Sequence, residues 1–207
     1  EADLTVTRLS ETAYLLVVPG ATLQRNLAWL RQNLQDEFAV ITDMTAAESV
    51  LCVMGPKARD LMARVSPADF SNAAHPFGTA KEIEVGMGLA RAHRVTYVGE
   101  LGWELYVSAE MAEHVFDTVW QSGAHHGLRL AGLHVLDSCR IEKGFRHFGH
   151  DISCEDHVLE SQLFELQDAM DTVKSFSLAF VFIIILEFLV IPLLVVKSQE
   201  LFENEIV

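Results

Sequence analysis

The chain has 207 residues, of which 15 are basic and 29 are acidic, so its formal net charge is −14. Half of the residues are apolar and 21% are charged, a balance that supports a hydrophobic core and excludes global disorder. A protein this acidic repels phosphate backbones, so we expect no nucleic acid partner. The three cysteines, Cys52, Cys139 and Cys154, form no C-x-x-C pair, which suits a reducing compartment.

The first 153 residues switch repeatedly between strand-like and helix-like patterns. Strands are predicted where apolar and polar residues alternate or form a short apolar run, and helices where apolar residues recur every three or four positions. In chain order, the patterns predict strands at Leu4–Leu9 and Tyr14–Val18, a helix from Thr22 to Leu34, strands at Val40–Met44 and Ser49–Met54, a helix after Pro56 to about Val65, a hairpin over Glu82–Val95, a strand at Leu105–Val107, and helices from Ser108 to about Ser122 and over Leu133–Lys143.

Single helices therefore separate pairs of strands. This order predicts an α+β fold with mostly antiparallel sheets and packed helices, not a doubly wound parallel sheet. No G-x-G-x-x-G motif follows a predicted strand and the sequence has no P-loop, so we expect no cradle for nucleotide phosphates.

The rest of the chain has a different composition. All 12 glycines lie at or before Gly149, whereas the run Leu178–Val196 is apolar except for Glu187. We therefore expect one domain over residues 1–163 and a divergent acidic and hydrophobic tail over residues 164–207. As a helix, residues 178–196 would span roughly 28 Å, so the predicted hydrophobic C-terminal helix is a candidate membrane anchor. A buried strand pair and a non-native extension are the alternatives.

The densest group of chemically useful side chains lies between Val95 and Val107. Strand alternation places Glu104 and Tyr106 on one face there, with Trp103 and Leu105 on the opposite face. A carboxylate among aromatic rings suits a heterocycle with adjacent N–H donors, because two oxygens accept two parallel hydrogen bonds. Spacing alone also fits a hairpin with a core tryptophan and a solvated glutamate.

The sequence HFGHD, from His147 to Asp151, has residue types that bind metals. Its spacing supplies no third and fourth ligand, and Arg146 beside it disfavours a cation, so we expect no metal site. Asp137 and Arg140 lie three positions apart on a predicted helix, where they would form an ion pair of little energetic value.

Four stretches together resemble the folate-binding aminomethyltransferase family, which includes the glycine cleavage T-protein and the C-terminal folate domains of dimethylglycine and sarcosine dehydrogenases. The stretches are Glu1–Leu9, Val53–Asp60, Tyr97–Val107 and Gly132–Ile152, in the order and spacing of the family. The sequences GELGWELY and RIEKGFRHFGHD resemble the dehydrogenase branch more than the T-protein. Leu136 stands where the T-protein has an arginine, which also fits that branch.

The resemblance implies roles for individual residues. Asp3 matches the catalytic acidic residue that orients the folate nitrogen attacking the one-carbon unit. Glu104 matches the residue that binds the N–H edge of the pterin ring. Tyr97 and Tyr106 match residues lining that pocket, and Leu105 is included with them as a cofactor-binding position.

The resemblance also implies a reaction. In the family's dehydrogenases, flavin oxidation of an N-methyl amine gives an iminium, and tetrahydrofolate accepts its carbon as methylene-tetrahydrofolate. FAD would belong to a flavin oxidoreductase domain expected upstream and missing from this sequence, which looks like the middle of a longer protein. We therefore expect residues 1–163 to be a partial folate-binding domain, in the cytoplasm or mitochondrial matrix, and leave open whether the isolated chain is active.

Two other functions stay open at this point. The same scaffold could serve a non-catalytic regulatory protein. Alternatively, the chain could be a tail-anchored membrane protein, with residues 178–196 as the anchor and a vestigial folate domain. A folate-dependent iron–sulfur assembly factor is disfavoured, because the stretch Lys143–Arg146 lacks the cysteine of that branch.

Overall fold

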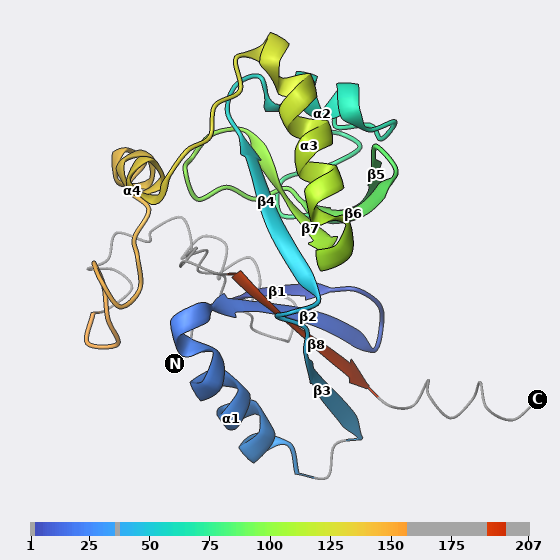
Figure 1. Cartoon of the computed structure of the whole chain (residues 1–207). Coiled ribbons are helices and arrows are strands. Elements are labelled where there is room, and N and C mark those ends of the chain that lie inside the picture. The colour runs from blue at the N-terminus through green and yellow to red at the C-terminus, as the bar shows by residue number, and fades with distance from the viewer. Residues whose placement is uncertain (1–2, 36–37, 157–189, 198–207) are drawn as a thin grey trace, which may run out of the picture. The chain divides into compact units, whose positions relative to one another are not determined.

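The computed structural model describes residues 3–35, 38–156 and 190–197, and the chain divides into two compact units. Unit 1 comprises residues 1–42 and 146–207, and unit 2 comprises residues 43–145. Figure 1 labels the helices and strands of both units. Because each unit has its own sheet and its own core, each is described by itself.

Unit 1 is built on a four-stranded sheet in the order β1-β2-β8-β3, with one long helix beside it (Figure 1). Its elements are β1 (Thr5–Arg8), β2 (Ala13–Pro19), a short 3-10 helix (Gly20–Thr22), α1 (Leu23–Asn33), β3 (Ala39–Asp43) and β8 (Val190–Lys197). β1 and β2 form an antiparallel hairpin, and Val18 of β2 packs with Leu27 of α1 in a small apolar cluster. Apolar burial of this kind holds the helix on the sheet.

Helix α1 begins without the side-chain hydrogen bond that usually caps a helix N-terminus. Thr22 occupies the N-cap position, but its side chain caps no backbone N–H group. Its hydroxyl instead donates to the carbonyl of Pro19 at 3.1 Å and accepts from the side-chain amide nitrogen, Nδ2, of Asn26 at 3.0 Å. The threonine therefore ties the turn before the helix to the first helical turn.

The described part of the tail is a strand. Val190–Lys197 forms β8, which pairs antiparallel with β2 so that Pro192 lies opposite Val17. For these residues the expected hydrophobic helix is wrong, because β-branched residues favour strands and a proline inside a helix removes one backbone hydrogen bond. Residues 178–189 and the predicted boundary at residue 163 lie outside the described residues.

A membrane-spanning helix is not found in the part of the chain that the structure describes, because no helix there combines sufficient length with sufficient apolar character.

Unit 2 contains the second four-stranded sheet, in the order β4-β7-β6-β5. Its elements are β4 (Glu48–Met54), α2 (Ala58–Val65), β5 (Ala80–Val85), β6 (Gly88–His93), β7 (Gly102–Ser108), α3 (Ala112–Gly123) and α4 (Leu133–Glu142), with short 3-10 helices at Ala109–Met111 and Ala124–His126. All neighbouring strands in this sheet pair antiparallel. The predicted α+β fold with antiparallel pairing is confirmed.

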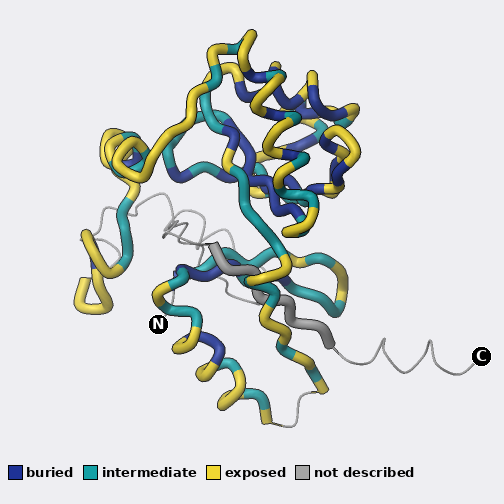
Figure 2. Tube along the Cα trace, in the orientation of Figure 1, coloured by how far each residue is buried: buried dark blue, intermediate teal, exposed yellow. Residues whose placement is uncertain are grey.

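One face of this sheet carries the hydrophobic core of unit 2, where α2 and α3 pack against it (Figure 1). Trp103 and Leu105 of β7 are fully buried there, together with Leu61 of α2 and Val115 of α3. Figure 2 shows β7 buried along nearly its whole length. Each such side chain stabilises the fold by about 1.5–3 kcal/mol, so the core face of β7 is a main source of stability.

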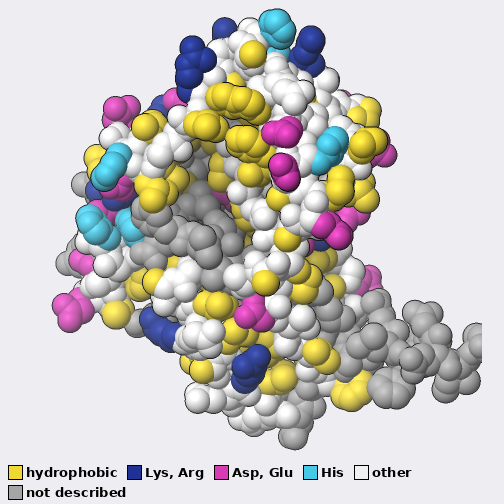
Figure 3. Space-filling model, in the orientation of Figure 1, with side chains coloured by type: hydrophobic (Ala, Val, Ile, Leu, Met, Phe, Trp, Pro, Cys, Tyr) yellow, Lys and Arg dark blue, Asp and Glu magenta, His cyan; other side chains and the backbone are white. Residues whose placement is uncertain are grey.

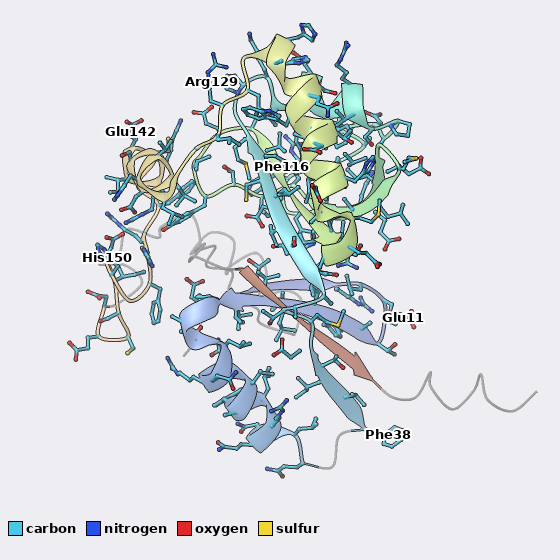
Figure 4. The ribbon with its side chains drawn as sticks, viewed as in Figure 1. Glu11, Phe38, Phe116, Arg129, Glu142 and His150 are labelled. Atoms are coloured by element: carbon cyan, nitrogen blue, oxygen red, sulfur yellow. The ribbon has the colours of Figure 1, made fainter. Side chains whose placement is uncertain are left out.

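The outer side of α3 also carries aromatic rings. Phe116, labelled in Figure 4, stacks on Trp120 one turn later, with ring centroids 6.3 Å apart and planes 6° apart. The two side chains are 38% and 40% exposed, and hydrophobic side chains are visible at this surface among acidic ones (Figure 3). Mutual stacking therefore shields part of each ring from water.

A glycine is required at position 102, at the start of β7, because the backbone of β4 lies very close to it. A Cβ atom there would lie 2.4 Å from the carbonyl oxygen of Val53 and 2.2 Å from the sulfur of Met54. We expect Gly102→Ala to lower the free energy of unfolding by about 1–3 kcal/mol, because the β4–β7 pairing must shift to admit the methyl group. Urea denaturation measures the effect.

Gly132→Ala is the matched control, since nothing lies within 4 Å of a Cβ built at Gly132. Its cost should stay below about 1 kcal/mol. Equal losses in both variants would show that the approach of β4 to β7 is not what selects glycine at position 102.

Candidate functional site

The second face of the unit 2 sheet, on the side opposite α2 and α3, is polar. Antiparallel pairing sets Glu104 of β7 opposite Cys52 of β4 and His93 of β6, and sets Tyr106 opposite Arg91. Residues opposite one another in adjacent strands share a face, so these side chains surround Glu104 on one surface. The predicted alternation, with Glu104 and Tyr106 opposite to Trp103 and Leu105, is confirmed.

Glu104 is a buried carboxyl group with one internal hydrogen-bond donor. Its side chain is 3% exposed, and the Tyr106 hydroxyl donates to its Oε2 at 2.8 Å. Oε1 is buried and accepts no hydrogen bond from any described residue. Burial raises the pKa of Glu104 to about 7, and the hydrogen bond from Tyr106 opposes that rise. The solvated glutamate of the alternative hairpin interpretation is therefore wrong.

His93 belongs to the same face and was not singled out from the sequence. It is 2% exposed, and its ring lies against that of Tyr106, with centroids 4.4 Å apart. Burial, and then the charges of Arg91 and His75, lower the pKa of His93 to about 4, so the imidazole is neutral at pH 7. The signal that could have found it is the alternation in Gly88–His93, where Ala90 and Ala92 face the core.

Tyr97 is held by residues at the end of α4. Its ring stacks on Phe145 with centroids 6.4 Å apart, and the guanidinium of Arg140 lies 5.9 Å from its centroid. Arg140 is 1% exposed, pairs with Asp137 at 2.6 Å and donates to the carbonyl of Phe145 at 3.1 Å. The predicted Asp137–Arg140 pair is confirmed, with its arginine buried and its carboxylate about half exposed.

The turn between Tyr97 and β7 packs closely on the same helix end. Gly99 has a φ of +73°, and a Cβ atom there would lie 2.2 Å from Cγ of Lys143. Lys143 also pairs with Glu100 at 3.5 Å. The glycine therefore supplies a backbone conformation that other residues rarely adopt, and at the same time admits the lysine stem.

The side chain of Leu105 lies in the hydrophobic core of unit 2. Its side chain is 0% exposed and belongs to the core cluster with Trp103 and Val107, on the opposite face from Glu104. A side chain in that position cannot line a pocket on the Glu104 face. The cofactor-binding role of Leu105 therefore stays a prediction that its backbone, and not its side chain, would have to fulfil.

Asp3, the predicted catalytic residue, lies just before β1 in unit 1 and is 5% exposed. Its role stays a prediction, as do the binding roles of Tyr97, Glu104 and Tyr106.

The HFGHD segment folds on itself. Asp151 accepts a hydrogen bond from the backbone N–H of His147 at 2.9 Å and lies 3.0 Å from Nδ1 of His150, which is labelled in Figure 4. Within residues 3–35, 38–156 and 190–197, no three His, Cys, Asp or Glu side chains form a group that could hold a metal ion. Asp151 therefore serves the local turn in the structure.

A small pocket adjoins Tyr106 on the polar face, with a volume of about 110 Å³. Its lining includes Glu48 and Arg91, whose charged atoms lie 3.4 Å apart. The volume is below the roughly 300 Å³ at which pockets for small molecules begin. We therefore assign no ligand to this pocket by itself.

The raised pKa of Glu104 has a consequence for stability. A carboxyl whose pKa rises from 4.5 to about 7 on folding keeps its proton longer in the folded state, so its contribution to stability falls as pH rises through that window. Glu104→Gln resembles the protonated form at every pH. We expect the free energy of unfolding of the variant, relative to the wild type, to increase by about 3 kcal/mol between pH 4.5 and pH 8.

Urea denaturation of both proteins at several pH values gives this difference, and the His93 contribution cancels because both proteins retain it. A difference that does not change with pH would mean that Glu104 titrates normally in the folded protein.

Comparison with known proteins gives a family and a fold. Residues 1–167 match the GCVT N-terminal domain. The 4-methylaminobutanoate oxidase (formaldehyde-forming) of Paenarthrobacter nicotinovorans is 47% identical over 152 residues, which cover 73% of this chain and 18% of that protein. The mitochondrial sarcosine dehydrogenase of Mus musculus is 38% identical over 178 residues, which cover 79% of this chain and 19% of that protein. The chain thus spans about a fifth of the length of these relatives.

A solved structure supports the fold alone. The heterotetrameric sarcosine oxidase from Corynebacterium sp. U-96 superposes with a TM-score of 0.52 at 21% identity, covering 63% of this chain and 65% of that chain. Since the family match covers residues 1–167, well over half of the sequence, the chain belongs to the folate-binding aminomethyltransferase family.

Proposed function

We propose that this chain is the tetrahydrofolate-binding portion of an enzyme similar to dimethylglycine and sarcosine dehydrogenases, and that Glu104 binds the pterin ring. The observation that carries the proposal is the buried Oε1 of Glu104, which accepts no hydrogen bond from the described residues. Native structures rarely leave a buried carboxylate oxygen in this condition, so a ligand donor is the natural partner.

The chemistry of the carboxyl group fits a pterin. The edge of the ring presents adjacent N–H donors, and a carboxylate accepts two such bonds in parallel. Oε2 already accepts from Tyr106 but retains a second lone pair. Hydrogen bonds from the ligand favour the charged form of Glu104, so binding should draw its pKa below about 7 and release a proton.

The other residues of the proposal divide between two tasks. Tyr97 and Tyr106 would supply flat faces against which the ring packs, each held by an aromatic neighbour, Phe145 and His93 respectively. Asp3 would hold its carboxyl near the folate nitrogen that attacks the one-carbon unit, where a negative charge stabilises the positive charge developing on that nitrogen.

Tetrahydrofolate would supply the nucleophilic nitrogen that takes one carbon from an iminium, leaving the demethylated amine and methylene-tetrahydrofolate. The oxidation of the N-methyl amine to that iminium would take place on FAD, held by a flavin oxidoreductase domain outside this sequence. The lengths of the relatives and the names of two of them, an oxidase and a dehydrogenase, support this division. The name of the mouse relative also supports a mitochondrial location.

A binding experiment tests the pterin contact. We expect Glu104→Gln to weaken binding of 5-formyltetrahydrofolate, a stable reduced folate, by about 100-fold in isothermal titration calorimetry, because one of the two charge-assisted hydrogen bonds becomes neutral and the other is lost. Glu84→Gln makes the same charge change at an exposed position of β5, which pairs with β6 and not with β7.

The control should bind within twofold of the wild type. Wild-type affinity should also fall about tenfold per pH unit below pH 7, as Glu104 takes up its proton, whereas the Glu104→Gln variant should lack this dependence. Unchanged affinity in Glu104→Gln would reject Glu104 as the pterin-binding residue.

A substitution at Asp3 distinguishes folate binding from one-carbon transfer. We expect Asp3→Asn to keep the affinity for 5-formyltetrahydrofolate within about threefold while the formation of methylene-tetrahydrofolate from formaldehyde slows at least tenfold, since the lost charge acts on the attacking nitrogen. Stopped-flow absorbance with the spontaneous reaction subtracted measures the rate. A parallel loss of affinity and rate would instead identify Asp3 as a binding or structural residue.

A further inference from the structure

The polar face around Glu104 contains a second buried atom without a hydrogen bond. Nε2 of His93 is buried and has no hydrogen-bond partner among the described residues, as is true of Oε1 of Glu104. His93 is the β6 residue directly opposite Glu104 in the β6–β7 ladder. Side chains at such positions begin about 5 Å apart and project from the same face.

We propose that His93 is a second direct contact to the pterin, its Nε2 pairing with a polar atom of the ring whose N–H edge Glu104 binds. This inference rests on the proposed function, since both residues are assigned to one ligand. Two unsatisfied polar atoms on neighbouring strands match a heterocycle whose edge carries several donors and acceptors.

The His93 imidazole is neutral at pH 7, which suits contact with an uncharged edge of the ligand. Burial, and after it the charge of Arg91 two residues earlier on the same strand and the same face, holds the pKa of His93 low. A neutral imidazole has one N–H donor and one lone pair. It therefore adds a directional hydrogen bond without a positive charge that would compete with the ligand for the Glu104 carboxylate.

A purely supporting role makes a different prediction. The ring of His93 lies 4.4 Å from that of Tyr106, and Tyr106 donates to Glu104. If His93 only kept Tyr106 in place, any ring of similar shape would serve. Phenylalanine keeps the ring and removes both nitrogens, so His93→Phe separates support from contact.

The experiment uses the full 207-residue chain with 5-formyltetrahydrofolate as probe and calorimetry as readout. We expect His93→Phe to weaken binding at least tenfold, whereas His125→Phe, at an exposed histidine after α3, binds as the wild type does. Circular dichroism and urea denaturation establish that each variant is folded. If His93→Phe does not fold, His93→Gln replaces it, since glutamine keeps the size and the hydrogen-bonding capacity without the ring and should retain part of the affinity.

A spectroscopic readout on the wild type does not depend on any variant folding. In protein labelled with ¹⁵N at histidine, the Nε2 resonance of His93 should shift on saturation with the probe, whereas the resonances of His147 and His150, two of the histidines outside unit 2, should not. The shift reports the hydrogen bond itself.

The outcomes separate this inference from the proposed function. Loss of affinity in Glu104→Gln with normal binding in His93→Phe, and no shift of Nε2, would overturn the His93 contact and leave the proposed function intact. Weak binding in His93→Phe without a shift of Nε2 in the wild type would assign His93 to positioning through Tyr106, which also overturns the contact. No binding of the probe to the wild type would overturn both.

Discussion

The burial of one carboxyl group, Glu104, governs the chemistry of unit 2. A carboxyl that is 3% exposed has lost its water, and among the described residues a single donor, Tyr106, replaces only part of that hydration. The protein therefore keeps a group that is costly when charged, in the middle of a strand that pairs on both sides. Groups with perturbed pKa values of this kind cluster at functional sites, so the burial of Glu104 supports the proposed pterin contact.

Strand β7 presents core residues on one face and the candidate site on the other. Trp103, Leu105 and Val107 enter the core beneath α2 and α3, while Glu104 and Tyr106 between them face the other way. Because side chains alternate strictly along a strand, the well-packed residues fix the direction of the polar ones. The rigidity that the core gives to β7 thus positions Glu104 together with the hydrogen bond from Tyr106.

Local patterns predicted much of this arrangement. The alternation in GWELYV is enough to place Glu104 and Tyr106 together, and the described helices and strands between residues 3 and 156 match the predicted elements to within about three residues. His93 was missed, and so was the burial of Arg140, for one physical reason, since the burial of each depends on contacts with segments distant in the sequence. His93 is buried because the strand register places it opposite Glu104. Arg140 is buried where α4 lies against Tyr97 and Phe145. The strand at Val190–Lys197 was one of the open alternatives, because an apolar run does not distinguish a helix from a strand paired with β2.

The opposed pKa shifts of Glu104 and His93 give the site its charge state. Between pH 4.5 and 6.5 the folded protein holds a proton on Glu104 that the unfolded chain has released, since the pKa of Glu104 rises to about 7. Over the same range it excludes a proton from His93 that the unfolded chain binds, since the pKa of His93 falls to about 4. The two contributions to the pH dependence of stability have opposite signs there and largely cancel. In that window both groups are neutral in the free protein, so the unliganded pair avoids the larger cost of a buried charge. A ligand that ionises Glu104 by donating hydrogen bonds then introduces the charge only together with the donors that stabilise it.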